Sequence, residues 1–202
     1  MSADRTRRAY SSLSDTYIGL FGHIESVLPA DKAFIAEAFQ GVHARILDAG
    51  CGPGHLTFYL QDLGYEASGI DLVPDFVAHA QQAYPMGDFS VGDITRIDER
   101  DRTLGGVLAW YSLIHMTEAE LGAALAEFRR VLIPGGILVL GAFHAAQCTP
   151  FAHKVTPAIA FSEDEVKALL NRAGFEVVRW ETRAATTETR AHLAVAAVAP
   201  VG

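Results

Sequence analysis

The strongest constraint on the fold is an alternation of short apolar runs with helical patterns, which begins near residue 44. The apolar runs predict strands at 44–48, 67–71, 89–91, 106–110 and 136–142. Strands that alternate with helices are typical of a parallel sheet covered by helices. Two later runs, at 175–182 and 192–199, have no helical pattern between them, so we expect them to pair as an antiparallel hairpin. The sequence therefore predicts the α/β class, with a doubly wound, Rossmann-like sheet.

Two of the helices in this alternation have clear start signals. Thr117 and Glu120 form a predicted capping box, and Ser162 and Glu165 repeat it. A further helix is expected at 55–63. The segment 143–161 reads as a long connection rich in aromatic residues, histidine and proline. Because connections of this length in compact domains are usually functional or disordered, we expect this one to cover a pocket.

The first 43 residues precede the alternation and differ from it. Helices are predicted at 15–28 and 31–39, and Gly41 ends the second one. We therefore expect a single domain, with an N-terminal helical cap at 1–43 and a core at 44–202. The pattern leaves two roles for the cap open, since it can simply cover apolar surface or close as a lid over a ligand.

Composition limits the classes of partner. The 202 residues include 24 acidic and 16 basic side chains, and the net charge of −8 disfavours a nucleic-acid substrate. The N-terminal residues show no secretory signal, and the longest apolar stretch, 131–140, is too short to span a bilayer. Two cysteines form neither a disulfide framework nor a metal-binding spacing. We expect a cytoplasmic monomer or homodimer with a small-molecule substrate and no membrane or nucleic-acid partner.

The segment 46–54 (ILDAGCGPG) joins a buried strand to a loop with glycine at every second position. Gly50, Gly52 and Gly54 allow the backbone to pass closely beneath a ligand, and the start of the next helix offers free N–H groups. The following strand ends at Asp71, whose carboxylate can accept hydrogen bonds from both hydroxyls of a ribose. These features predict a nucleoside-containing cofactor at the carboxyl ends of the strands.

Asp48 and the glycine spacing help to choose between two cofactor classes. A dinucleotide would place its pyrophosphate near the negative charge of Asp48, and its fingerprint requires glycine where this sequence has His55. S-adenosylmethionine offers an ammonium group and no phosphate, so Asp48 suits it, directly or through water. The alternative role for Asp48 is to order the loop by accepting backbone N–H bonds.

Four motifs in sequence order resemble those of class I S-adenosylmethionine-dependent methyltransferases of the small-molecule type. They are ILDAGCGPG at 46–54, GIDLVPD at 69–75, VGDI at 91–94 and FRRVLIPGGILVL at 128–140. The likeness extends over roughly residues 8–199. It implies a seven-stranded sheet in the order 3-2-1-4-5-7-6, with the last strand pair antiparallel. It also implies S-adenosylmethionine as cofactor and S-adenosylhomocysteine as product.

The same resemblance assigns roles to individual residues. The three loop glycines would underlie the methionine moiety, Asp71 would hold the ribose, Leu72 would pack on the adenine, and Asp93 would accept a hydrogen bond from the adenine amino group. Tyr10 and Tyr17 match positions at which an N-terminal helix closes over the cofactor. The expected cofactor-binding residues are Tyr10, Tyr17, Asp48, Ala49, Gly50, Cys51, Gly52, Gly54, His55, Asp71, Leu72, Gly92, Asp93, Ile94 and Trp110.

The expected catalytic residue is His115, which follows the fourth strand at the edge of the sheet where ligands bind in such folds. Because a sulfonium methyl is already electrophilic, the enzyme mainly has to align the acceptor, and the alternative for His115 is to pack beneath the cofactor. The expected substrate-binding residues are Tyr111, His115, Phe143 and His144.

The segment 110–116 (WYSLIHM) also limits the acceptor. It lacks the Asn- or Asp-Pro-Pro-aromatic run of methyltransferases that act on DNA bases or glutamine, and no acidic cluster predicts a metal site. We therefore predict methyl transfer to an O, N or C nucleophile of an unidentified small molecule. Two alternatives stay open: a non-catalytic S-adenosylmethionine-binding protein and, less favoured, an NAD-dependent oxidoreductase.

Overall fold

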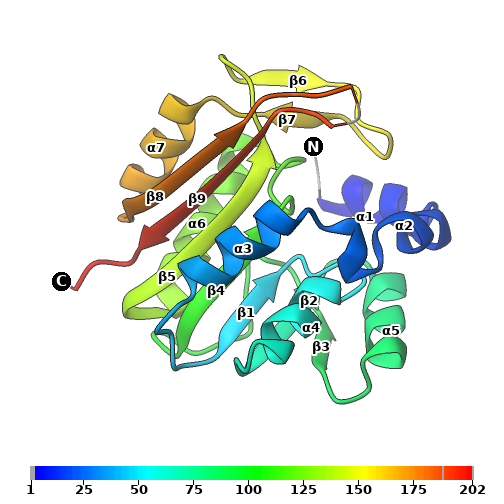
Figure 1. Ribbon diagram of the computed structural model, residues 1–202, viewed down its shortest axis with the longest axis horizontal. Helices are drawn as coiled ribbons and strands as arrows, with labels where there is room; N and C mark the ends of the chain where they lie inside the picture. The colour runs from blue at the N-terminus through cyan, green and yellow to red at the C-terminus, as the bar shows by residue number, and fades with distance from the viewer. Residues whose placement is uncertain (1–2, 188, 202) are drawn as a thin grey trace.

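A seven-stranded sheet forms the centre of the protein in the computed structural model, which describes residues 3–187 and 189–201 (Figure 1). Met1 and Ser2 of the predicted cap, and Glu188 and Gly202 of the predicted core, lie outside the described residues. The strand order is β3-β2-β1-β4-β5-β9-β8. These strands are β1 Ile46–Ala49, β2 Ala67–Asp71, β3 Asp88–Val91, β4 Leu104–Trp110, β5 Leu132–Phe143, β8 Glu176–Arg183 and β9 His192–Val198.

The first five strands are parallel, and β9 runs antiparallel to both of its neighbours, β5 and β8. Counted along the chain within this sheet, the order is 3-2-1-4-5-7-6. The predicted fold class, strand order and terminal antiparallel hairpin are therefore confirmed.

Two apolar layers bury the sheet between helices. On one face, α3 (Pro29–Ala38) and α4 (His55–Asp62) pack through residues such as Phe34 and Leu60 against inward side chains of β1 and β4. On the other face, α6 (Glu118–Val131) and α7 (Glu163–Arg172) contribute residues such as Phe128 and Leu170. Central strands of a parallel sheet are covered on both faces, which explains why β1 and most of β4 are buried without alternation.

The helix start signals agree with the structure. Thr117 Oγ1 accepts a hydrogen bond from the Glu120 N–H, and the Glu120 carboxylate accepts one from the Thr117 N–H, so the capping box is confirmed. At the start of α7, Ser162 Oγ accepts from the Glu165 N–H, which is one half of the second predicted capping box. Another helix of the core, α5 (Pro74–Ala83), begins with proline in its first turn.

The N-terminal segment differs from the sequence prediction. The predicted helix 15–28 is wrong, because α2 (Ser14–Phe21) ends at Gly22 and a single 3-10 turn, η1 (Ile24–Ser26), follows. The chain also contains α1 (Ala3–Ser11), which the sequence did not predict. No residue of α1 is fully buried, and its sequence, ADRTRRAYS, has four charged residues and only three apolar ones, so it offers no apolar run that predicts a helix. The helix predicted at 31–39 begins earlier, at Pro29.

The segment 143–161 is also more regular than predicted. It contains β6 (Thr149–Phe151) and β7 (Ala158–Ala160), which pair as a short antiparallel hairpin beyond the carboxyl end of β5 (Figure 1). Strands of three residues are too short to show a two-residue period, and prolines interrupt the segment.

The helices α1 and α2 lie beyond the sheet on the side of β1 and β2 (Figure 1).

Candidate active site

A large cavity, hereafter the carboxyl-edge cavity, opens where β1, β2, β3 and β4 end. It encloses about 960 Å³ of space between atoms, its open mouth included. Its walls come from the loops after these strands, from α5 and α6, and from the N-terminal helices. The lining residues are Ala3, Thr6, Arg7, Tyr10, Tyr17, Gly50, Gly52, Asp71, Leu72, Val73, Phe76, Gly92, Asp93, Ile94, Thr95, Trp110, Tyr111, Ser112, His115, Met116 and Glu120.

The glycine loop contributes the floor of this cavity. Gly50 and Gly52 line it with φ values of 86° and 53°, in the left-handed region that favours glycine. A Cβ atom on Gly50 would lie 2.4 Å from the Cβ of Ser112, so no larger residue fits without a shift of the backbone. The hydroxyl oxygen of Ser112 is buried without a hydrogen-bond partner in the structure, which leaves a free acceptor beside this glycine.

Asp71 connects the loop to the second strand. Its carboxylate accepts hydrogen bonds from the Gly52 N–H and the Val73 N–H, each at 2.8 Å. Burial raises the pKa of Asp71 to about 6, and the backbone hydrogen bonds from Val73, Gly52 and Leu72 oppose that rise. The carboxylate is therefore ionised at neutral pH. Each oxygen has spare lone pairs, so the group can accept further hydrogen bonds from a ligand in the cavity.

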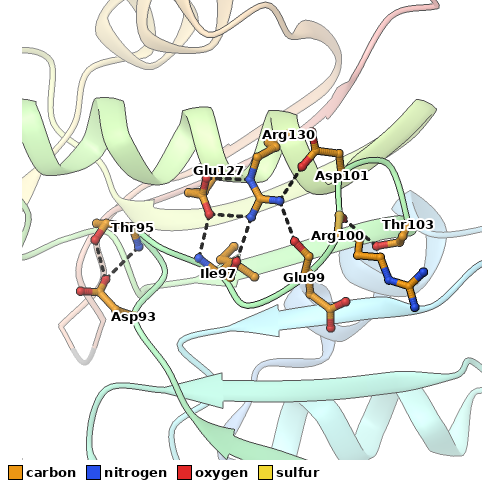
Figure 2. Close-up of polar contacts among 9 residues, drawn as sticks. All are labelled: Asp93, Thr95, Ile97, Glu99, Arg100, Asp101, Thr103, Glu127 and Arg130. Carbon is orange, nitrogen blue, oxygen red and sulfur yellow. Dashed lines mark hydrogen bonds and ion pairs between the residues drawn. The ribbon is translucent and has the colours of Figure 1, made fainter.

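The wall formed by 92–95 is held in place by a charged network. Asp93 Oδ1 accepts hydrogen bonds from the N–H and the hydroxyl of Thr95 at 2.8 and 2.7 Å. Two residues further on, the Ile97 N–H donates to Glu127 of α6 at 2.8 Å. The Arg130 guanidinium binds both Glu127 oxygens and donates to the Ile97 carbonyl oxygen, as Figure 2 shows.

The same guanidinium also binds the Glu99 carbonyl oxygen at 2.6 Å and the Asp101 carboxylate at 2.8 Å (Figure 2). Hydrogen bonds from Arg130 and from the Ile97 N–H hold the pKa of Glu127 below its usual value. Arg130 therefore ties the connection between β3 and β4 to α6. Since the cavity residues Asp93 and Ile94 belong to that connection, the network fixes one wall of the cavity.

Several predicted cofactor residues lie behind the cavity wall. Asp48 is 1% exposed, and its carboxylate accepts a hydrogen bond from the Thr57 hydroxyl at 2.7 Å. Burial raises the pKa of Asp48 to about 7. Burial likewise lowers the pKa of His55 to about 4, and its Nδ1 atom is buried without a partner in the structure. The predicted residues that do not line the cavity are Asp48, Ala49, Cys51, Gly54, His55, Phe143 and His144.

The N-terminal helices close the cavity with aromatic rings. Tyr10 packs edge to face against Tyr17, with ring centroids 5.4 Å apart, and both rings contact Phe76 of α5. The Tyr10 hydroxyl lies 2.9 Å from His115 Nε2, and His115 Nδ1 lies 2.9 Å from the Pro157 carbonyl oxygen. A carbonyl oxygen only accepts, so Nδ1 has the proton and the neutral ring accepts the Tyr10 hydroxyl at Nε2. Burial keeps the pKa of His115 below its usual value.

The loop after β4 presents Trp110, Tyr111 and Ser112 to the cavity. Tyr111 has a φ of 58°, which is uncommon for a residue with a side chain. Its ring contacts Phe143, whose ring in turn contacts His153 and Phe151 of the segment 143–161. His153 also packs against His115, with ring centroids 5.2 Å apart.

Sequence reasoning missed some of the lining residues. Ala3, Thr6 and Arg7 belong to the unpredicted helix α1, while Thr95 and Ser112 directly follow predicted residues. Thr95 and Ser112 could have been predicted from their positions beyond a strand, because ligands of parallel sheets bind at the carboxyl ends of the strands. Tyr10 was found only by family likeness.

Within 3–187 and 189–201, no three His, Cys, Asp or Glu side chains are grouped so that they could hold a metal ion. In the same part of the chain, no helix has the length and apolar character needed to cross a bilayer.

Residues 46–136 match the family described as "Methyltransferase domain". The malonyl-[acyl-carrier protein] O-methyltransferase of Yersinia pestis is 36% identical over 94 residues, which cover 46% of this chain and 34% of that protein. The chain spans between a third and a half of the length of the first curated relatives it matches.

Solved structures with the same fold cover the whole chain. The 1,6-didemethyltoxoflavin-N1-methyltransferase of Burkholderia thailandensis, with bound 1,6-didemethyltoxoflavin and S-adenosylhomocysteine, has a TM-score of 0.79 at 22% identity. The match covers 92% of that protein's chain and 100% of this one. The [4+2]-cyclase SpnF has a TM-score of 0.83 at 18% identity, with 98% of that chain and 100% of this one covered. Identities this low show the fold alone.

Proposed function

We propose that this chain, whose residues 46–136 match the methyltransferase domain family, is a class I S-adenosylmethionine-dependent methyltransferase that transfers the methyl group of S-adenosylmethionine to a nucleophilic atom of a small molecule. The observation that carries the proposal is the position of Asp71. Its buried carboxylate lies in the wall of the carboxyl-edge cavity and, at the same time, orders the glycine loop through Gly52. This arrangement offers hydrogen-bond acceptors to a ribose and a close backbone approach to the rest of the ligand.

The residues of the cavity fit the parts of S-adenosylmethionine. Asp71 would hold the ribose hydroxyls, Leu72 and Ile94 would flank the adenine, and Asp93 would meet its amino group through the oxygen that Thr95 does not occupy. The unpartnered Ser112 hydroxyl beside Gly50 would accept a hydrogen bond from the ammonium group. This last contact takes the place that the sequence assigned to Asp48, which is bound to Thr57 behind the loop.

The bound cofactor supplies a methyl group on a positively charged sulfur, so the protein has to align the acceptor and exclude water. The rings of Tyr10, Tyr17 and Phe76 cover the cavity and serve the second purpose. Tyr111 and His115 line the cavity and would face the acceptor, with Phe143 behind Tyr111. His144 lies further out, where its Nδ1 is bonded to the Phe161 carbonyl oxygen.

The geometry of His115 favours packing over proton abstraction. Both of its ring nitrogens have partners, the Tyr10 hydroxyl and the Pro157 carbonyl oxygen. The imidazole can act as a base only after Tyr10 has left Nε2. A larger loss of transfer rate than of cofactor affinity in His115→Ala would favour the catalytic role, and equal losses would favour packing.

Binding of the cofactor tests the first half of the proposal. Isothermal titration calorimetry should detect S-adenosylmethionine and S-adenosylhomocysteine but not NAD. Asp71→Asn should weaken S-adenosylhomocysteine by about 1–3 kcal/mol, the usual loss for a charged hydrogen-bond partner. Asp75→Asn, four residues away and exposed on α5, is the matched control and should bind like the wild type. Binding of NAD without S-adenosylmethionine would overturn the proposal.

Transfer tests the second half. Incubation with methyl-labelled S-adenosylmethionine and a cell extract should place label in the dialysable fraction. Label in protein or nucleic acid instead would contradict a small-molecule acceptor. No label in any fraction, together with tight cofactor binding, would favour the alternative of a non-catalytic binder.

The acceptor and the assembly stay open within this proposal. The relatives named above act on an oxygen in one case and on a nitrogen in the other, and SpnF is named a cyclase. The proposal includes a cytoplasmic location and a monomer or homodimer. It also includes the absence of a nucleic-acid partner, which the net charge of −8 supports.

A further inference from the structure

A buried row of polar side chains leads from the cavity wall to the opposite edge of the sheet. The Tyr111 hydroxyl lies 2.6 Å from Nδ1 of His192, the first residue of β9. His192 Nε2 lies 3.9 Å from a carboxylate oxygen of Asp31 in α3. Arg183, at the end of β8, forms an ion pair with the same carboxylate. His192 is 3% exposed and Asp31 is 6% exposed, so burial strengthens each of these interactions.

The position of the His192 proton follows from its neighbours. Burial, with smaller contributions from Arg183 and His144, lowers the pKa of His192 to about 4, so the ring is neutral at pH 7 and has one proton. His192 Nε2 is buried without a hydrogen-bond partner in the structure, and the negative charge of Asp31, 3.9 Å away, favours the proton on that nitrogen. Nδ1 is then unprotonated and accepts a hydrogen bond. Burial raises the pKa of Tyr111, so the phenol keeps its proton and donates it to Nδ1.

The backbone at Tyr111 supports a functional reason for this arrangement. Its left-handed φ of 58° is unfavourable for a side chain of this size and persists only where the surroundings enforce it. The hydrogen bond to His192 and the contacts with Trp110 and Phe143 enforce it here. The result is a phenol fixed at the cavity wall beside Ser112.

We propose that the Tyr111 hydroxyl, with its proton committed to His192, binds the methyl acceptor by accepting a hydrogen bond from it. The site would then select acceptors whose nucleophilic atom bears a proton, such as a hydroxyl or an amine, over acceptors without one. Tyr111 is an acceptor-binding residue in this account, while His192 and Asp31 are positioning residues that act through it. The inference rests on the proposed function, because it assigns part of the same cavity to the acceptor.

A matched pair of probes tests the selection. Phenol and anisole differ in a single donor, and their binding to the protein saturated with S-adenosylhomocysteine can be measured by ligand-observed NMR. The wild type should bind phenol about tenfold more tightly, the ratio expected for one net hydrogen bond. Tyr111→Phe and His192→Leu should bring the ratio close to one. His192→Asn should keep most of this affinity ratio, because the Asn side-chain oxygen can occupy the position of Nδ1 and accept the hydrogen bond from the Tyr111 hydroxyl. Equal binding of the two probes by the wild type, binding of neither, or an unchanged ratio in Tyr111→Phe would overturn the inference.

A second measurement needs no acceptor. In protein labelled with ¹⁵N-histidine, the His192 Nδ1 resonance should have the shift of an unprotonated nitrogen and should move in Tyr111→Phe. The matched control is Tyr65→Phe, which also loses a hydroxyl hydrogen bond, to the Phe39 carbonyl oxygen, but leaves the His192 shift unchanged. A protonated Nδ1 would overturn the inference. If the wild type does not bind S-adenosylhomocysteine, the proposed function is wrong. Failure of the proposed function can therefore be told apart from failure of this inference.

Discussion

Asp48 offers a direct test of how the buried carboxylates shape this protein. The residue lies in β1 at 1% exposure, and its hydrogen-bond partner is the Thr57 hydroxyl. Replacing it with asparagine keeps the shape and the oxygen that accepts from Thr57, while it removes the negative charge. We therefore expect Asp48→Asn to raise the free energy of unfolding at neutral and alkaline pH.

The magnitude follows from the pKa of Asp48. Burial raises it from 3.8 to about 7, so the folded protein retains the proton over a pH range in which the unfolded chain has lost it. Stability is then lost as pH rises from about 4 to about 7 and stays low above that. The free energy of unfolding that is lost over this whole pH range is about 4 kcal/mol. Between pH 5 and pH 8, the advantage of the asparagine variant should grow by roughly 2–3 kcal/mol.

The assay is urea unfolding of both proteins without ligand at pH 5, 6, 7 and 8. Asp71, with a pKa near 6, contributes a slope of the same sign in both proteins, so only the difference between them reports Asp48. Asp62→Asn is a control at the end of α4 and should run parallel to the wild type. If the difference between Asp48→Asn and the wild type stays constant over this range, the carboxylate titrates normally and the reasoning about burial is refuted.

Three further perturbations test other parts of the site. Gly50→Ala forces a side chain into a left-handed backbone and a 2.4 Å approach, and it should abolish S-adenosylhomocysteine binding; calorimetry showing wild-type affinity would contradict the packing described here. Arg130→Met removes the centre of the network that holds the connection between β3 and β4, and urea unfolding should show a loss of about 2–3 kcal/mol, against less than about 1 kcal/mol for the neighbouring Arg129→Met. Tyr10→Phe removes the donor that favours neutral His115, so the pKa of that imidazole should rise toward its usual value in an NMR titration, and an unchanged pKa would show that the hydroxyl makes no such bond.

The fold was readable from the sequence wherever burial produced a pattern. The parallel strands are short apolar runs because helices cover both faces, and β2 was predicted with its observed bounds of Ala67–Asp71. The pattern failed where burial is weak. The helix α1 has no fully buried residue, and the strands β6 and β7 have three residues each. Segments with so few apolar residues, or with so few positions, give no burial pattern that the sequence alone reveals.

The candidate site was predictable to the extent that a parallel sheet gathers its strand ends. Gly50, Asp71, Asp93 and Trp110 each lie at or just after the end of a different strand, and all four line the same cavity because the carboxyl ends of those strands meet at one edge. Asp48 shows the limit of this reasoning. It also lies near a strand end, but in β1 its side chain is bound to Thr57 behind the loop, a distinction that depends on side-chain direction rather than on position in the sequence.

The role of a histidine was beyond prediction for a related reason. His115 was singled out as a candidate catalytic residue, with packing beneath the cofactor as the alternative, and the structure shows that its two nitrogens join separate segments, Tyr10 from α1 and Pro157 from the connection before β7. Both partners lie in the parts of the chain whose secondary structure the sequence did not reveal. His192 starts the strand predicted at 192–199 and was assigned no role from the sequence, whereas in the structure its neighbours Asp31 and Arg183 determine which nitrogen meets Tyr111. The groups that contact its two nitrogens decide whether an imidazole acts as a base, accepts a hydrogen bond or only packs against its neighbours. For this protein those groups come from segments far apart in the chain, so the chemistry of the cavity is a property of the assembled fold.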